Sequence, residues 1–270
     1  MLPGCRADLQ DERQRIRYLD YDGGDDLNFR QLYSGSSGNL YEVVAENGKR
    51  LIIDPGVTWK KLIKALDYKL DNIEGCFVTH EHKDHSRAVC ECWAAGLEIC
   101  STAETFEGMD IDSHRINILK DKDLIRFPSF EAYAFAIEHD VPTLGFIIRE
   151  KSSSEYLLFA IDTKTIVQKF PYPFSIIALE CAYDAAELTK RVEAGEVNET
   201  YARRLLTSHM ERQITHKYLR ECVNREKLRE LHLLHLSSGN IDKRALAKEF
   251  QEEFCCDVIV KYHKGGKDAV

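Results

Sequence analysis

The chain has 270 residues, of which 44% are hydrophobic and 30% are charged, and its formal net charge is −8. This is globular composition, and it excludes a disordered polar chain, a collagen-like repeat and a coiled-coil rod. The acidic balance also disfavours long nucleic acid as a partner, because neutralisation of phosphates by basic side chains supplies most of that affinity. It suits a small anionic ligand that is held by a few groups and a metal.

The start of the chain is polar and charged, and we expect an N-terminal extension (residues 1–28) before a single folded domain (residues 29–270). In the first half of this domain, short β-branched and aromatic runs alternate with turn residues, and Asn47-Gly48 is a strong hairpin signal. The pattern predicts strands at 29–33, 40–45, 50–53, 75–79 and 97–101, and helices at 58–70 and 85–95.

The second half of the domain repeats this pattern. It predicts strands at 124–127, 130–138, 143–149, 156–161, 175–180, 231–236 and 257–261, and helices at 184–193, 199–208, 213–229 and 241–254. Strands and helices alternate in both halves, with hairpins among them. This alternation predicts an α/β fold of packed layers with mixed sheets.

The sequence carries no signal for a membrane or a secretory route. Its apolar runs, such as 174–179, are far shorter than the roughly 20 residues that a spanning helix needs. The nine cysteines are an odd number and form no Cys-x-x-Cys pair. We therefore expect reduced thiols, a cytoplasmic location and no membrane partner.

A cluster of metal-binding residue types follows the strand at 75–79. His80, His82, Asp84 and His85 form a His-x-His-x-Asp-His motif. Side chains two apart at the end of a strand point to the same side, and the chain then turns so that the later pair faces the same point. Imidazole and carboxylate groups suit Zn²⁺, Mn²⁺ or Fe²⁺. The motif predicts a metal site.

Three further residues of ligand type follow apolar strands, namely His139, Asp162 and His235. Open α/β sheets place their sites at the carboxyl ends of strands. Any one of these residues alone could be an ordinary core or surface residue. Together with the motif they predict a two-metal site, whose centres lie about 3.5–4 Å apart.

These residues, with Asp54 after the second hairpin, resemble the pattern of the metallo-β-lactamase superfamily over residues 29–262. The resemblance implies a four-layered αββα sandwich with two mixed sheets and two divalent cations between them, Zn²⁺ first and Mn²⁺ as the alternative. Asp54 would orient the motif loop. The implied ligands are His80, His82 and His139 for one cation, and Asp84, His85 and His235 for the other, with Asp162 bridging.

A finer resemblance involves residues 32–39, 179–184, 208–210 and 234–237, which are similar to the YycJ/WalJ branch. That branch contains DNA exonuclease-like proteins and is close to the phage-type anti-Pycsar enzymes, which hydrolyse cyclic nucleotides. The chain departs from the YycJ pattern in two ways. Tyr183 stands where that branch typically has a histidine, and the stretch at 187–207 is shorter.

The finer resemblance implies a dinuclear-metal phosphodiesterase that opens small 3′,5′-cyclic nucleotides to 5′-monophosphates. The alternatives are a 5′→3′ DNA exonuclease of the YycJ kind, a thioester hydrolase of the glyoxalase kind, and a protein that binds nucleotides without turnover. Relatives of this kind are often dimers, so a homodimer fits the resemblance.

Other candidates for the site come with alternatives. Ser36, Ser37 and Asn39, in a loop rich in glycine and hydroxyl groups, are candidates for substrate binding, although a plain hairpin turn explains them equally well. We expect His209 and Asp84 to be catalytic, with His209 as a general acid. A helix cap is the other reading of His209. Glu180 is a candidate to orient a ligand, and a surface glutamate at the end of a strand is the alternative.

Arg203 and Arg204, with Lys190 and Arg191, lie on the two helices expected beside the mouth of the site. They could hold nucleotide phosphates. Charged residues on a predicted helix more often form a solvated face, and that alternative remains open here.

Overall fold

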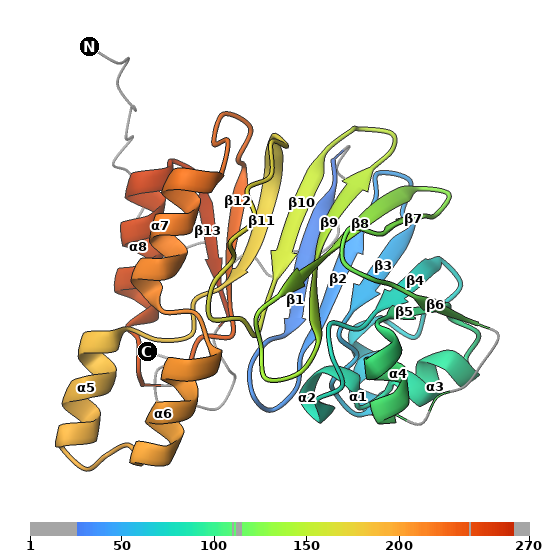
Figure 1. Ribbon diagram of the computed structural model, residues 1–270. Coiled ribbons are helices and arrows are strands. Elements are labelled where there is room, and N and C mark those ends of the chain that lie inside the picture. Colours follow the sequence, from blue (N-terminus) through green and yellow to red (C-terminus); the bar gives the residue numbers. More distant parts are fainter. Residues whose placement is uncertain (1–25, 110, 112–114, 238, 262–270) are drawn as a thin grey trace.

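The computed structural model describes residues 26–109, 111, 115–237 and 239–261. Two sheets pack face to face, and helices cover the outer face of each (Figure 1). This arrangement confirms the predicted α/β sandwich of four layers. Of the expected N-terminal extension, residues 1–25 lie outside the described residues, whereas Leu27 is buried in the core and the first strand begins at Asn28.

The first sheet has six strands in the order β1-β2-β3-β4-β5-β6. β1, β2 and β3 are antiparallel, and β3 to β6 are parallel. The strands are β1 (Asn28–Tyr33), β2 (Leu40–Val44), β3 (Arg50–Ile53), β4 (Ile73–Phe77), β5 (Ile99–Ser101) and β6 (Ile116–Ile118). The helices on its side are α1 (Trp59–Ala65), α2 (Lys83–Ser86), α3 (Val89–Ala94) and α4 (Ala103–Met109).

The second sheet has seven strands in the order β13-β12-β11-β10-β9-β8-β7. Its β7 to β10 part is antiparallel and its β10 to β13 part is parallel. The strands are β7 (Leu124–Arg126), β8 (Phe130–Ile137), β9 (Thr143–Glu150), β10 (Tyr156–Ala160), β11 (Phe174–Glu180), β12 (Glu230–Leu234) and β13 (Asp257–Val260). The helices are α5 (Ala185–Glu193), α6 (Glu199–Ser208), α7 (Arg212–Cys222) and α8 (Lys243–Phe254).

Three of the four apolar clusters among the described residues hold the layers together. The central cluster lies between the sheets and is rich in aromatic side chains, such as Phe77 and Phe146, whose ring centroids are 4.9 Å apart. A second cluster packs α7 and α8 on the outer face of the second sheet, and a third packs α1 and α3 on the first. Because the inner and outer faces are both apolar, strands such as β2, β3 and β11 are buried along their whole length.

Two helices differ from the prediction because the backbone turns away from the helical path. The helix predicted at 58–70 ends at Ala65, and Asp67 and Tyr68 adopt left-handed conformations with φ of 52° and 60°. The helix predicted at 85–95 is divided into α2 and α3. At the division the backbone N–H of Ala88 donates to the carbonyl of Pro55, at 2.8 Å.

Three further differences concern short or terminal segments. The helix predicted at 213–229 ends at Cys222, because Val223 is extended. α4 and β6 were not predicted. With seven and three residues, respectively, they are too short to give a clear periodic pattern.

None of the helices in the described part of the chain has the length and apolar character that a bilayer crossing requires. The cytoplasmic location stays a prediction.

Gly56 permits a close approach between the β3–α1 loop and α2. A Cβ atom at this position would lie 1.7 Å from the carbonyl oxygen of Asp84. The Gly56 N–H donates to the Asn39 carbonyl, and the Asn39 N–H donates to the Asp84 carbonyl, both at 2.8 Å. The β1–β2 loop, the β3–α1 loop and α2 are therefore locked together around one residue that has no side chain.

We predict that Gly56→Ala lowers the free energy of unfolding by about 3 kcal/mol or more, because backbone must move to admit the methyl group. Gly195→Ala is the control. It has φ of 72° and nothing within 4 Å of the added Cβ, so it should cost only about 1 kcal/mol for the left-handed backbone. Urea unfolding measures both. Equal losses in the two variants would contradict the close approach.

Candidate metal centre

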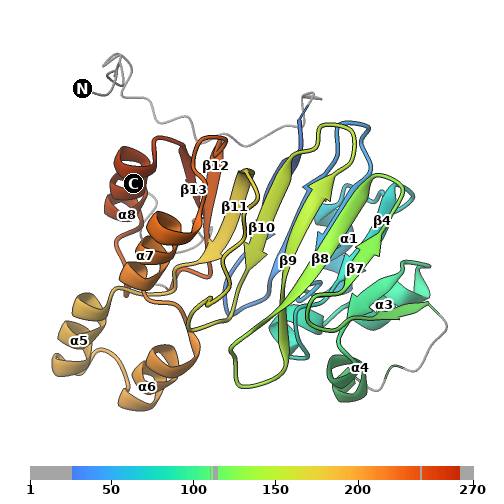
Figure 2. The ribbon, with the colours of Figure 1, turned by 45° about the horizontal axis from the view of Figure 1, so that its top comes forward.

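The predicted site residues meet at one edge of the sandwich, where strands of both sheets end. His80 and His82 lie in the loop between β4 and α2, and Asp84 and His85 lie in α2. From the second sheet side, His139 follows β8, Asp162 follows β10, Glu180 ends β11, His209 follows α6 and His235 follows β12. Figure 2 shows the strands of the two sheets running toward this common edge.

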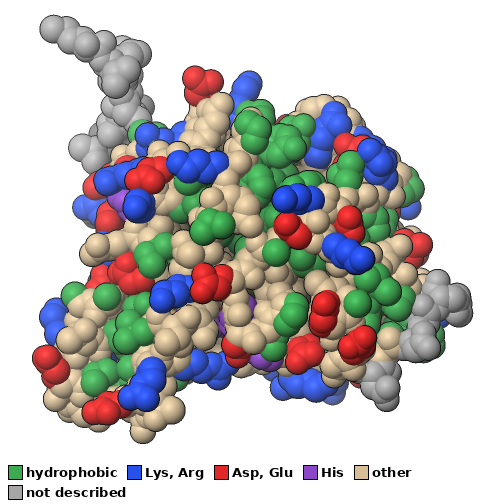
Figure 3. Space-filling view, viewed as in Figure 1, with side chains coloured by type: hydrophobic (Ala, Val, Ile, Leu, Met, Phe, Trp, Pro, Cys, Tyr) green, Lys and Arg blue, Asp and Glu red, His purple; other side chains and the backbone are tan. Residues whose placement is uncertain are grey.

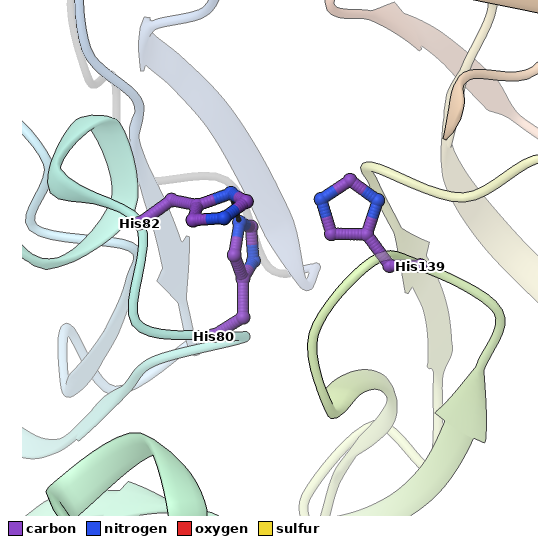
Figure 4. Close-up of side chains that lie close together, drawn as sticks. All are labelled: His80, His82 and His139. Atoms are coloured by element: carbon purple, nitrogen blue, oxygen red, sulfur yellow. Dashed lines mark hydrogen bonds between the residues drawn. The ribbon is translucent and has the colours of Figure 1, made fainter. Parts of the chain in front are cut away.

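Three histidines form the first group, although they come from two loops on opposite sheets. The rings of His80 and His82 lie edge to face with centroids 4.6 Å apart, and His139 points toward them from the β8–β9 loop (Figure 4). Its ring lies 5.0 Å from that of His80 and 5.4 Å from that of His82. Each residue offers a nitrogen within 4.8 Å of those of the others.

Asp162 joins this group to a second one. Its Oδ2 lies 3.1 Å from His85 Nε2 and 3.7 Å from His80 Nε2. Its Oδ1 lies 3.3 Å from His235 Nδ1. Glu180 and His209 complete a group with Asp162 and His235, whose ligand atoms lie within 4.8 Å of one another. One carboxylate thus adjoins histidines from both sheets.

Asp54 and Thr79 orient the histidines of the first sheet. Asp54 Oδ2 accepts from His85 Nδ1 at 2.8 Å, and Asp54 Oδ1 accepts from the Thr79 N–H at 2.8 Å. The Thr79 hydroxyl donates to Asp54, so its oxygen accepts from His80 Nδ1 at 2.9 Å. With Nδ1 engaged in both rings, Nε2 is the nitrogen that faces the centre.

Glu180 has the same role for the histidines of the second sheet. It is fully buried, and its Oε1 lies 2.7 Å from His209 Nδ1 and 3.0 Å from His235 Nδ1. Its Oε2 accepts from the Thr163 N–H at 2.8 Å. The two rings stack with centroids 4.9 Å apart. This is the contact pattern of a carboxylate that fixes the tautomer and direction of metal-binding imidazoles.

Three residues of the site have left-handed backbones. Asp54, Asp162 and His235 have φ of 53°, 52° and 56°. A non-glycine residue in this region costs on the order of 1 kcal/mol or more, and such strain concentrates at functional sites. The strain at all three positions supports a role beyond packing.

The electrostatics of the site separate neutral from charged histidines. Burial, followed by the neighbouring His85, lowers the pKa of His80 well below its usual value, so its ring is neutral and its lone pair is available. Burial opposes the charged ring of His209 too, but the carboxylates of Glu180 and Asp162 raise its pKa to about 9. Burial raises the pKa of Asp162, yet His235 and His85 outweigh it and hold that pKa well below the usual range.

Several buried atoms of the site have no hydrogen-bond partner among the described residues, which is costly unless a ligand binds them. They are Nδ1 of His139, Oδ1 of Asp162 and Nε2 of His235. His80 Nε2 and His82 Nδ1 lie 3.1 Å apart, close to the roughly 3.3 Å that separates two nitrogens on one tetrahedral Zn²⁺. The residues present therefore fit divalent cations.

The remaining predicted residues lie at the rim or under the site. Asp84 Oδ2 is 3.8 Å from His85 Nε2. Asn39 is fully buried, and its Nδ2 lies 3.0 Å from the same nitrogen. Ser36 and Ser37 are exposed, and no contact places them against the cluster.

Sequence reasoning missed two residues that the structure brings to the site. Asp140 Oδ1 lies 2.9 Å from His139 Nε2, and its position directly after His139 was the available signal. Thr79 bridges Asp54 and His80. A threonine gives no signal for this role until Asp54 is known to lie beneath it.

Comparison with known proteins supports the fold and finds partial sequence similarity to two groups of proteins. Residues 39–126 match the sequence profile of the family described as "Anti-Pycsar protein Apyc1". This stretch includes the His-x-His-x-Asp-His motif and ends before His139. The structure of the metallo-β-lactamase fold protein YhfI from Bacillus subtilis matches with a TM-score of 0.66 at 16% identity, over 88% of this chain and 97% of that one.

Two nucleases are similar in sequence. Exodeoxyribonuclease WalJ of Streptococcus pneumoniae serotype 2 is 25% identical over 138 residues, which cover 47% of this chain and 51% of that protein. Exodeoxyribonuclease YycJ of Bacillus anthracis is 28% identical over 123 residues, covering 42% and 46%. The chain spans about half the length of the curated relatives it matches.

The contact between His209 and Glu180 predicts a pH-dependent stability of the metal-free protein. Because the pKa of His209 is raised to about 9, the contribution is fully present below the unfolded pKa of about 6.5 and is lost as pH rises through the folded value. In a chelator, the stability difference between the wild type and His209→Gln should shrink by about 3 kcal/mol between pH 6 and pH 10. A difference that stays constant, measured by urea unfolding, would contradict the ion pair.

Proposed function

We propose that this chain, which has the metallo-β-lactamase fold and is similar in sequence to the anti-Pycsar family and to WalJ and YycJ, is a two-cation phosphodiesterase. We propose small 3′,5′-cyclic nucleotides as its substrates and 5′-monophosphates as its products. The first cation site is His80, His82 and His139. The second cation site is Asp84, His85 and His235, and Asp162 would bridge the two sites.

The position of Asp162 is the observation that carries this proposal. Its carboxylate lies within 3.7 Å of ring nitrogens of His80, His85 and His235, which belong to both sites. Two cations held by these residues would lower the pKa of a bound water toward neutrality and would stabilise charge on the attacking and leaving oxygens of an in-line displacement. Such a clamp suits a phosphodiester, in which charge develops at both ends.

His209 is the proton carrier in this proposal. It is almost fully buried, and its Nδ1 shares a proton with Glu180 Oε1 at 2.7 Å. With a pKa of about 9, the ring is protonated at neutral pH. Its Nε2–H is then a second donor, available to the leaving oxygen of the substrate. Glu180 keeps the ring fixed while that proton is given up.

The anti-Pycsar match over residues 39–126 and the net charge of −8 support a small anionic substrate. Few cationic groups are needed to hold one phosphodiester beside two cations.

A DNA exonuclease is the second candidate, and one observation favours it beside the similarity to WalJ and YycJ. Four basic side chains are exposed and have no ion pair among the described residues, namely Lys83 on α2, Arg87 directly after α2, and Arg203 and Arg204 on α6. Figure 3 shows basic side chains on both sides of the histidines at the mouth. By contrast, Lys190 and Arg191 pair with Glu187 and Glu196.

A product assay separates these candidates. Purified protein with Mn²⁺ or Zn²⁺ is offered a panel of 3′,5′-cyclic mononucleotides in parallel with 5′-phosphorylated single- and double-stranded DNA. We expect 5′-monophosphates from the cyclic substrates and intact DNA. Mononucleotides from DNA alone, with a rate that falls steeply as salt rises, would establish the exonuclease instead. Turnover of neither would contradict phosphodiester hydrolysis.

We predict that Asp162→Ala and His85→Ala each lower turnover by more than about 100-fold, because changes even to groups that only orient ligands cost 10–100-fold. His216→Ala is the matched control, since His216 pairs with Glu253 on α8, away from the site. Near-normal rates in both site variants, with the fold intact by circular dichroism, would refute the mechanism.

A further inference from the structure

A buried line of hydrogen bonds runs beneath the second cation site. Ser34, Asn39 and Tyr41 are all buried, and they lie in and just after the β1–β2 loop. The Tyr41 hydroxyl lies 3.0 Å from Ser34 Oγ and 2.9 Å from Asn39 Oδ1. None of these three residues is used by the proposed chemistry.

The donors and acceptors give this line one direction. Asn39 Oδ1 can only accept, and it accepts from the Tyr41 hydroxyl and from the Gly35 N–H at 2.9 Å. Because the Tyr41 hydroxyl donates its proton to Asn39 Oδ1, the Tyr41 oxygen accepts from the Ser34 hydroxyl. Ser34 Oγ in turn accepts from the backbone N–H of His235 at 3.1 Å. Burial raises the pKa of Tyr41 well above its usual value, so the hydroxyl keeps its proton.

The line of hydrogen bonds ends at α2, on the side of the site that belongs to the first sheet. With Oδ1 occupied, the amide nitrogen of Asn39 is turned toward α2, where it donates to the Asp84 carbonyl at 3.2 Å and lies 3.0 Å from His85 Nε2. The line therefore joins the backbone of His235, from the second sheet, to the segment that carries Asp84 and His85, from the first sheet.

Tyr41 also packs between the sheets. Its ring is stacked on Phe29 at 5.8 Å and contacts Phe159 of the second sheet edge-on at 5.1 Å. The hydroxyl is thus fixed by aromatic packing at the level where the two sheets meet.

We propose that Tyr41 is a positioning residue whose hydroxyl, through Ser34 and Asn39, holds the backbones of His235 and Asp84 in register at the second cation site. This inference rests on the two-cation site of the proposed function. The first cation site receives no contact from the line, so the effect is specific to one of the two cations.

The test is Tyr41→Phe, which keeps the ring and removes only the hydroxyl. Chelator-stripped protein is titrated with Mn²⁺, and free Mn²⁺ is followed by electron paramagnetic resonance. The wild type is expected to bind two equivalents. In Tyr41→Phe the first equivalent should bind as in the wild type, and the second about 10-fold more weakly.

Two further variants separate positioning from packing. Tyr218→Phe is the matched control, because it removes a buried hydroxyl that donates to the Gln168 carbonyl at 3.2 Å, away from the site. It should lose similar stability and keep both affinities. Ser34→Ala breaks the same line at another link, so it should reproduce the Tyr41→Phe effect, and the double variant should be no worse than Tyr41→Phe.

The outcomes separate the positioning role of Tyr41 from the two-cation site on which it rests. If the wild type binds two equivalents and Tyr41→Phe matches it, or loses both affinities equally, the positioning role is overturned while the proposed function stands. If the wild type binds fewer than two equivalents, both fail. Should Tyr41→Phe not fold, Ser34→Ala carries the same comparison.

Discussion

The aromatic core between the two sheets is the constraint on which the site depends. Contacts such as Phe77 with Phe146, at 4.9 Å, and Tyr41 with Phe159, at 5.1 Å, fix the separation of the sheets. Protein interiors are close-packed and resist gradual deformation. The strand ends of both sheets are therefore held at a constant distance, and each proposed cation site draws ligands from both sides. The core that stabilises the fold is also what sets the geometry of the site.

Burial of so many ionisable groups in one place costs free energy, and contacts between carboxylates and histidines offset part of that cost. Asp54 and Glu180 are fully buried carboxylates that each take the Nδ1 side of site histidines, while Asp162 lies between the two sets. The nitrogens and oxygens left over face a common centre. Such a cluster is expensive as a purely structural device, because unmatched buried polar atoms cost free energy. Divalent cations would coordinate these atoms and so remove the free-energy cost of leaving them unmatched.

The layers and most strands could be predicted because buried strands and amphipathic helices leave periodic patterns, and β3 and α6 match the predicted bounds. The metal-binding motif was visible because its residues are adjacent in sequence. Asp140 and the line through Tyr41 were not, because they depend on loops that meet only after folding. Ser36 and Ser37 are exposed, and their substrate-binding role stays a prediction.

The central claim is that two cations bind between the sheets, one on each ligand set. Crystals grown with Mn²⁺ and measured at its absorption edge test this directly, because anomalous scattering locates each ion. The structure predicts two peaks about 3.5–4 Å apart, one among His80, His82 and His139 and one beside His85 and His235, with Asp162 touching both. A single peak, or peaks away from Asp162, would contradict the two-cation site.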